Sequence, residues 1–407
     1  MTRPSTHKTF LRGTHRLVSP AETVERVLPM TRAMGITRVA DVTGLDVVGI
    51  PVVMVCRPNA RSVSVSQGKG LAIDAARASG LMEAIEQWHA EHILQPLLFC
   101  TAAELSARRR LVDIAGLPRL SIGSFHPHHK MLWIEGEDIM SGGPLWVPLE
   151  VVHADYTVPL PPGSGCFLTT STGLASGNHR LEAVLHGLYE VIERDAVALW
   201  RAAGPARRAR TRLDLGSVDD PICRDVLARF DRADIAVGVW DASSELGLPV
   251  FVAEIVDRVP HPGRVLYVSG GQGCHRSRAV ALARALTEAA QSRLTAIAGA
   301  RDDVDRTSYE LFRSPPHIAA ARAEIEQFEG PWRSFGAASD GFSERFDEDL
   351  AAVLAALRGA GLGQAAVVDL TRPELGLPVV RVVVPGLESM WDAPGYTPGQ
   401  RAQAVSS

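Results

Sequence analysis

Three long segments of the chain combine a helical spacing of apolar residues with a strand-like run and a Gly/Ser-rich turn directly before them. They cover residues 71–92, 181–200 and 278–298, and they follow SVSVSQGKG, GSGCFLTTSTGLASGNHR and VLYVSGGQGCHRS. Helices with an apolar stripe must bury it, and a preceding strand offers a sheet for that purpose. Further apolar runs predict strands at 47–55, 132–134, 235–240, 249–255, 365–369 and 379–385. The alternation indicates an α/β (mixed α+β) fold in which helices cover β-sheets.

Composition limits the class of protein. The 407 residues are 46% hydrophobic and 22% charged, which fills a sizeable core and excludes a disordered chain. The net charge of −4 gives no reason to expect nucleic acid or an anionic membrane as partner. The N-terminus lacks an apolar segment of signal-peptide length, and no apolar run is long enough to span a bilayer. We therefore expect a cytoplasmic protein.

The five cysteines are scattered and odd in number, so a disulfide framework or a structural zinc site is not expected. Cys166 and Cys274 stand in glycine-rich turns that could border a pocket, or they could be small packing residues. The loop FHPHHK at 125–130 brings histidines together, but adjacent histidines beside proline rarely share one ion. We do not assign a metal to it.

Acidic residues gather on one face of each of the first two helices. At about 100° per residue, Ser79, Glu83 and Glu86 fall on one narrow face of the first helix. Glu182, His186, Glu190 and Glu193 share a face of the second. A solvated acidic face is the simplest interpretation, but such faces usually carry Lys or Arg four residues after Glu. Here only Arg194 is basic.

Five such carboxylates repel one another unless cations neutralise them. Oxygen ligands on rigid helices suit Mg²⁺, which prefers carboxylates, water and substrate phosphates. Because one Mg²⁺ takes one or two carboxylates, the set Glu83, Glu86, Glu182, Glu190 and Glu193 predicts several ions and therefore a nucleotide. His186 on the same face could be a general base or a buried, hydrogen-bonded histidine.

Two glycine-rich stretches precede helices. Lys69 in SQGKG would sit at the turn that feeds the first helix and could bind phosphate, although the spacing is not that of a Walker A motif. Residues 270–273, GGQG, could be another such site or only a tight turn. On the third helix Arg284, Glu288 and Gln291 line one face, which could bind ligand or be a surface stripe with an Arg–Glu ion pair.

Together these segments resemble the YcaO family of ATP-dependent enzymes that modify peptide backbones. The motifs that carry the resemblance are SQGKG, SGLMEAIEQ, TGLASGNHRLEAVLHGLYEVIERDAVALW and RALTEAAQSRLTAIAGARDD. They extend over nearly the whole chain. The opening GTHRLVSPAETVERV is similar to that of members that work beside a TfuA protein.

The resemblance implies a YcaO fold with an ATP site between the acidic helices. In it Glu83, Glu86, Glu182, Glu190 and Glu193 would hold Mg²⁺. Nucleotide binding would fall to eight residues: Arg16, Thr23, Lys69, Ser79, Asn178, Arg194, Arg284 and Gln291. Glu193, Arg194 and Lys69 would be the catalytic residues. Gln87 departs from the family, which commonly has Arg at that position.

The implied organisation is an N-terminal part of the fold at 1–60, the catalytic domain at 61–390 and a C-terminal tail at 391–407. The tail lacks the alternating prolines of many azoline-forming members, and Trp391 at its start could face substrate. We expect a homodimer that installs a thioamide in a ribosomally made peptide or protein. A TfuA-like partner and a sulfur donor would assist it.

Three alternatives stay open. The chain could be an azoline-forming cyclodehydratase, or a non-catalytic ATP-binding assembly partner, although a degenerate site would be expected to lose some of its acids. A glutamine-dependent ligase would need a nucleophilic Cys beside a base, and the sequence offers no convincing pair.

Overall fold

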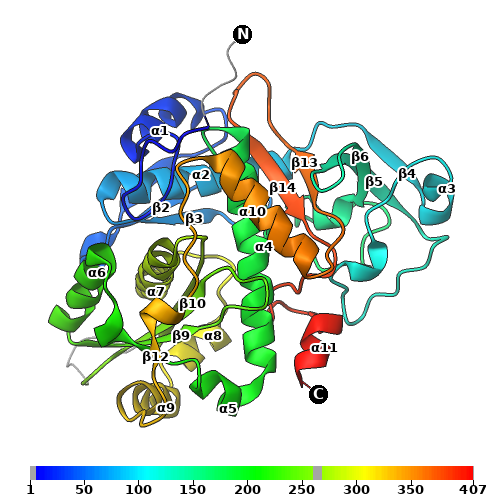
Figure 1. Cartoon of the computed structure of the whole chain (residues 1–407). Helices are drawn as coiled ribbons and strands as arrows, with labels where there is room; N and C mark the ends of the chain where they lie inside the picture. The colour runs from blue at the N-terminus through cyan, green and yellow to red at the C-terminus, as the bar shows by residue number, and fades with distance from the viewer. Residues whose placement is uncertain (1–5, 260–267, 407) are drawn as a thin grey trace.

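Among the residues that the structure describes, three antiparallel sheets and one short parallel pair of strands carry the helices (Figure 1). The computed structural model describes residues 6–259 and 268–406. Buried apolar residues form three clusters, one around each of the long helices α2, α4 and α7. The predicted mixed α/β class, with helices covering sheets, is confirmed.

The first sheet has the order β1-β2-β3, and helix α2 packs against it. Its elements are β1 (Arg38–Asp41), β2 (Val52–Cys56), β3 (Val65–Lys69) and α2 (Ile73–Glu91). A Cβ atom on Gly68 would collide with the carbonyl oxygen of Ala76, so glycine is needed for this close approach of strand and helix. The expectation that SQGKG forms the turn before the helix is therefore wrong for its first four residues. They belong to β3, and Lys69 is the last residue of that strand.

The second sheet repeats this arrangement with the order β11-β10-β9 and helix α7. Its elements are β9 (Ile235–Asp241), β10 (Val250–Asp257), β11 (Ser269–Cys274) and α7 (Arg278–Ala298). Residues 270–273 pair with β10, so they are not a tight turn. Cβ atoms on Gly271 and Gly273 would collide with carbonyl oxygens of α7. Residues 265–267 of the predicted run before this helix lie outside the described residues.

The third sheet has the order β4-β5-β13-β14-β7, with β6 paired to β5, and helix α4 packs against β14 and β7. Its elements are β4 (Leu97–Thr101), β5 (Lys130–Asp138), β6 (Pro144–Pro148), β7 (Leu174–Ser176), β13 (Ala366–Asp369), β14 (Val379–Val383) and α4 (Arg180–Ala202). Each long helix thus follows a strand, as the sequence predicted, and in the structure a connection of three residues joins the two.

The remaining helices cover the three sheet–helix units. They are α1 (Pro20–Val27), α3 (Ala102–Ser106), α5 (Gly204–Ala209), α6 (Pro221–Arg232), α8 (Arg306–Phe312), α9 (Pro315–Glu326), α10 (Phe346–Gly359) and α11 (Gln400–Ser406). The parallel pair consists of β8 (Leu213–Asp214) and β12 (Arg333–Ser334). In the described part of the chain no helix is long and apolar enough to cross a membrane.

The C-terminal segment is tied to the middle of α4. Arg401 of α11 donates to both carboxylate oxygens of Asp195, at 2.9 and 2.8 Å, and Asp195 is fully buried. The carboxylate of Glu388 accepts from the Tyr396 hydroxyl at 2.6 Å and from the Gly399 N–H at 2.8 Å. These bonds fix residues 388–402 beside the helix that carries three of the predicted metal ligands.

The predicted strand at 47–55 is shorter in the structure, where β2 begins at Val52. Gly49 has a positive φ of 70° and Pro51 lacks an N–H group, so this stretch cannot join a ladder. The sequence did not predict β1, β4, β6, β8 or β12. The proposed boundary at residue 60 falls between β2 and β3 of one sheet, and the division of the chain stays a prediction.

Candidate active site

Acidic side chains from two helices accept hydrogen bonds from both ends of strand β7 and from the last residue of β11. Glu86 of α2 accepts from the N–H and the hydroxyl of Ser176, at 2.8 and 2.6 Å. On α4, Glu190 accepts from the N–H of Gly173 at 3.2 Å and Glu193 from the N–H of Cys274 at 2.9 Å. The ends of the strands thus orient the carboxylates.

Burial dominates the electrostatics of this acidic cluster, which we define as Glu83, Glu86, Glu190 and Glu193. Burial raises the pKa of Glu83 to about 7 and that of Glu86 to about 8, and nearby acids of the cluster add to both shifts. The pKa values of Glu190 and Glu193 are also raised, mainly by burial. Carboxyl groups with such raised pKa values lack sufficient positive charge around them.

Arg194 is the cation that lies beside Glu190 and Glu193 of α4. Its guanidinium lies 3.8 Å from Glu190 and 3.7 Å from Glu193, and these carboxylates raise its pKa although burial opposes the shift. The expectation that the acids are unpaired is therefore wrong for these two residues. At both distances the pair is longer than a hydrogen bond, and the Nε atom of Arg194 has no partner.

Lys69 reaches the site from the end of β3. Its ammonium group donates to Glu288 of α7 at 2.6 Å, and Glu288 also accepts from the N–H of Gln272 at 3.2 Å. Although burial opposes the shift, Lys69 and Arg194 lower the pKa of Glu288. The predicted alternative of an Arg284–Glu288 ion pair is wrong, because Glu288 pairs with Lys69. The sequence placed Glu288 on the polar face of its helix but did not assign it to the site.

Glu182 has surroundings of its own at the start of α4. It lies 3.8 Å from Arg16, and it accepts from the N–H of Leu17 at 2.8 Å and of Asn178 at 3.4 Å. The Asn178 side chain donates to the hydroxyl of Thr23 at 3.0 Å. The structure therefore brings Arg16, Thr23, Asn178 and Glu182 together, but it gives Glu182 a cationic partner that the sequence did not predict.

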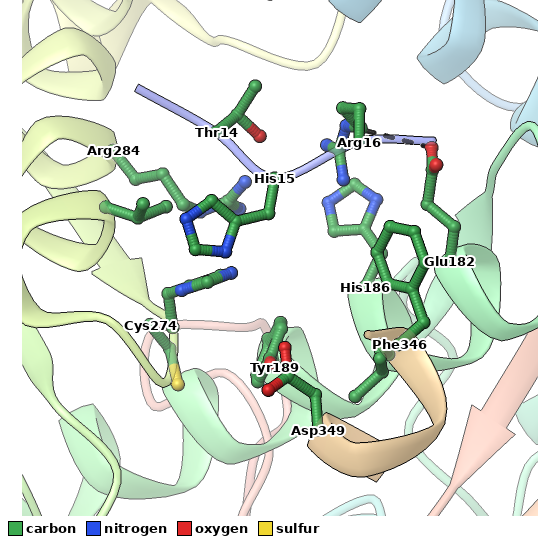
Figure 2. Close-up of a pocket in the computed structure, with 13 residues that line it drawn as sticks. Thr14, His15, Arg16, Glu182, His186, Tyr189, Cys274, Arg284, Phe346 and Asp349 are labelled. Carbon is green, nitrogen blue, oxygen red and sulfur yellow. Dashed lines mark ion pairs between the residues drawn. The ribbon is translucent and has the colours of Figure 1, made fainter. Parts of the chain in front are cut away.

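A pocket lies beside this second group (Figure 2). The N-terminal segment contributes Thr14, His15 and Arg16, and α4 contributes Glu182 and His186, as Figure 2 shows. Cys274 and Arg284 line it from the β11–α7 unit. The Nε atom of Arg284 is buried without a partner, so the pocket offers a donor that no protein group satisfies.

Burial, together with Arg16 and Arg284, lowers the pKa of His186 well below its ordinary value. The ring is therefore neutral at pH 7. Cys274 is buried and its thiol pKa is raised well above the ordinary value, mainly by burial, so the thiol stays protonated. Neither group is a charged participant near neutral pH.

The other predicted residues occupy less informative positions. Ser79 lies half-buried on α2, one turn before Glu83, and Gln291 lies half-buried on α7, one turn after Glu288. Cys166 is buried in the α2 cluster of apolar residues rather than in the pocket. His129 of the histidine loop bonds the carbonyl oxygen of Gly163 at 3.1 Å.

The residues present fit a nucleotide with Mg²⁺. Carboxylates are the ligands that Mg²⁺ prefers, and a bound cation would lower the raised pKa values of the acidic cluster. The free donors of Arg194 and Arg284 fit phosphate oxygens. Among the described residues no three His, Cys, Asp or Glu groups are close enough to hold one ion together. Phosphate and water would therefore have to complete the coordination.

Comparison with known families gives a match over residues 67–388 to the family described as YcaO cyclodehydratase, ATP- and Mg²⁺-binding. The chain belongs to the YcaO family. A protein of Rhizobium leguminosarum bv. trifolii, named as an uncharacterized protein in the tfuA 3′ region, is 40% identical over 389 residues. The match covers 92% of this chain and 88% of that protein.

Two solved structures show the same fold. YcaO from Methanopyrus kandleri, bound with AMPPCP and Mg²⁺, is 22% identical with a TM-score of 0.75, and the match covers 97% of this chain and 99% of that one. A heterocyclase in complex with substrate and cofactor is also 22% identical, with a TM-score of 0.79. The match covers 98% of this chain but 56% of the heterocyclase. The YcaO assignment, the fold and the ATP and Mg²⁺ cofactors of the family are confirmed.

Proposed function

We propose that this YcaO protein activates a backbone amide of a peptide or protein with ATP and Mg²⁺ and installs a thioamide there, with a TfuA-like partner. The observation that carries the proposal is the acidic cluster, in which Glu86 and Glu193 are buried and Glu83 and Glu190 half-buried. All four carboxyl groups have raised pKa values beside Lys69 and Arg194. Such an arrangement is costly for a protein alone and is stabilised by bound cations.

We assign the metal-binding role to Glu83, Glu86, Glu190 and Glu193, with Glu182 next to them at the start of α4. Mg²⁺ would neutralise phosphate charge during transfer. Arg194 would leave its long contacts to the acids for a phosphate oxygen, since 3.7 Å is longer than a charged hydrogen bond. Lys69 would have to share its proton donors between Glu288 and phosphate. Arg16, Thr23, Ser79, Asn178, Arg284 and Gln291 would hold the rest of the nucleotide.

With hydrosulfide as the sulfur source, the proposed reaction converts an amide and ATP to a thioamide, ADP and phosphate. Hydrosulfide adds to the amide carbon, the amide oxygen attacks the γ-phosphorus, and the bond to the bridging oxygen of ADP breaks. The C–O bond then breaks, phosphate leaves with the former amide oxygen and takes the proton from sulfur, and the thioamide remains. Lys69 and Arg194 would stabilise the negative charge that develops on oxygen.

One observation favours this chemistry over azoline formation. The relative from Rhizobium is named for its position in a tfuA region. The family description as cyclodehydratases supports azoline formation as the second candidate. The homodimer, the sulfur donor and the obligatory nature of a partner stay predictions.

The deciding experiment combines the protein, ATP, Mg²⁺, sulfide and a peptide encoded beside its gene, followed by mass measurement. We expect exchange of oxygen for sulfur, dependence on sulfide, stimulation by a TfuA protein, and no effect when neighbouring Cys, Ser or Thr residues of the peptide are replaced by Ala. Loss of water without sulfide, abolished by that replacement, would establish the azoline chemistry instead. ATP hydrolysis without any change in the peptide would favour the assembly role.

A further inference from the structure

Arg381 of β14 is a buried arginine next to the acidic cluster. Arg381 is 3% exposed, and its Nη2 atom donates to the carbonyl oxygen of Thr170 at 2.5 Å. Its Nε and Nη1 atoms have no hydrogen-bond partner. Within the described residues no carboxylate forms an ion pair with it. A buried guanidinium with two unused donors is unfavourable and requires an explanation.

Arg212 provides the comparison, because it is equally buried and has the same two atoms without partners. Its guanidinium carbon lies 4.6 Å from the centre of the Trp240 ring and 5.7 Å from that of Trp332. Aromatic faces attract a guanidinium and accept its N–H groups weakly. In the described parts of the chain no aromatic ring lies over Arg381 in this way. Aromatic contacts account for Arg212 and leave Arg381 unexplained.

The segment 170–173 connects Arg381 to the acidic cluster. Thr170 accepts from Arg381 at one end of this segment, and the Gly173 N–H donates to Glu190 at the other. Between them, the buried hydroxyl of Thr172 also lacks a partner. Burial lowers the pKa of Arg381, whereas Tyr156 and Glu190 raise it, so both groups are near the guanidinium. Unused donors and an unused hydroxyl therefore flank one short segment beside the proposed ATP site.

We propose that Arg381 and Thr172 bind the backbone of the substrate peptide. Nη1 of Arg381 would donate to an amide carbonyl oxygen, and the hydroxyl oxygen of Thr172 would accept from a peptide N–H group. This inference rests on the proposed function and names the groups that hold the peptide. A backbone amide offers one acceptor and one donor, which matches what these residues leave unused.

The loop that carries Tyr156 supplies the surface along which such a peptide would run. Tyr156, Val158 and Leu160 are 40%, 86% and 51% exposed. Of the three, Tyr156 is the one whose charge acts on Arg381. Exposed apolar side chains are typical of a surface that binds a peptide. Backbone recognition at Arg381 would set the position of the peptide, and this loop would contact its side chains.

The test uses N-acetylglycine N-methylamide, which contains two amides and no reactive side chain, as the probe. The Nε–H signals of Arg381 and Arg212 are followed by NMR in the full chain with AMPPCP and Mg²⁺ present, and Arg381→Lys and Arg212→Lys assign them. We expect a saturable shift of the Arg381 signal at millimolar probe and none of the Arg212 signal. No saturable shift at Arg381, or equal shifts at both positions, overturns the proposal.

Variants give a second measurement. Arg381→Lys should weaken probe binding about tenfold, and Thr172→Val, which keeps the shape, about fivefold. Arg212→Lys should leave probe binding unchanged although it alters an equally buried arginine. Thr172→Val keeps the proposal testable if Arg381→Lys fails to fold. AMPPCP binding, measured by calorimetry, distinguishes failure of the peptide subsite from failure of the proposed function. If AMPPCP binds normally but the Arg381 signal does not shift when the probe is added, the peptide subsite alone is rejected. If the unaltered protein does not bind AMPPCP, the proposed function is rejected.

Discussion

Helix α7 carries two charged regions, one buried and one half-buried, that differ in how their charges are balanced. Around Arg293, Asp46 at 2.9 Å and Asp257 at 2.7 Å surround the guanidinium with carboxylates, and all three side chains are almost fully buried. Around Glu288, Lys69 balances that carboxylate, but the neighbouring acidic cluster keeps raised pKa values. In the Arg293 region every charge is paired, so a bound ion would not stabilise it further. The region with surplus carboxylates is where a cation would be stabilised.

The largest expected effect is on stability. Arg293→Met should lower the free energy of unfolding by about 3–5 kcal/mol, because it leaves Asp46 and Asp257 buried without this cation. Urea unfolding measures the loss. Nucleotide affinity of the folded fraction should be unchanged, and a parallel loss of affinity would show that the two regions are not separate.

Glu190→Gln and Glu193→Gln test the other region. We expect each to reduce ATP hydrolysis at least about 100-fold, since removal of one group that stabilises transferred charge has this size of effect. Circular dichroism should show an unchanged helix content, because the apolar side of α4 is intact. Normal hydrolysis with Mg²⁺ by either variant contradicts the metal assignment.

A smaller effect is expected at the cations of the site. Lys69→Ala and Arg194→Ala should each weaken ATP binding roughly tenfold, because each removes a charged hydrogen bond to phosphate. Lys130→Ala is the matched control, since Lys130 is exposed at the start of β5. Equal losses in all three variants would attribute binding to overall charge.

The smallest effect concerns pH. The pKa values of Glu83 and Glu86 are raised to about 7 and about 8, so the folded protein binds more protons than the unfolded chain between about pH 4.5 and 8. Stability without Mg²⁺ should therefore fall as pH rises through this range, and added Mg²⁺ should reduce the fall. Melting temperatures at about pH 4.5 and pH 8 measure this fall in stability. The double variant Glu83→Gln/Glu86→Gln, which lacks both carboxyl groups, is the control. A rise in stability with pH in the metal-free protein contradicts the burial of these acids.

Local patterns predicted the parts of the fold that depend on neighbours in sequence. The long helices follow from apolar spacing, and the acids Glu83, Glu86, Glu190 and Glu193 follow from their shared faces. Pairings between distant residues were beyond these patterns, because Lys69 and Glu288 are separated by 219 positions and meet only through the packing of β3 and α7. Gly68, Gly271 and Gly273 were misinterpreted as turn residues. The sequence alone does not distinguish a glycine required for strand–helix contact from one required for a turn.

Because α11 is attached to Asp195, the stability of α4 depends on the end of the described chain. Asp195 follows Arg194 directly, and without Arg401 its buried carboxylate would lose its two charged hydrogen bonds. Opening of residues 388–402 would therefore destabilise the turn of α4 that holds Glu193 and Arg194. Proteolysis at the tail and inactivation at the nucleotide site would then be linked events, and a ligand that holds α4 in place would protect both.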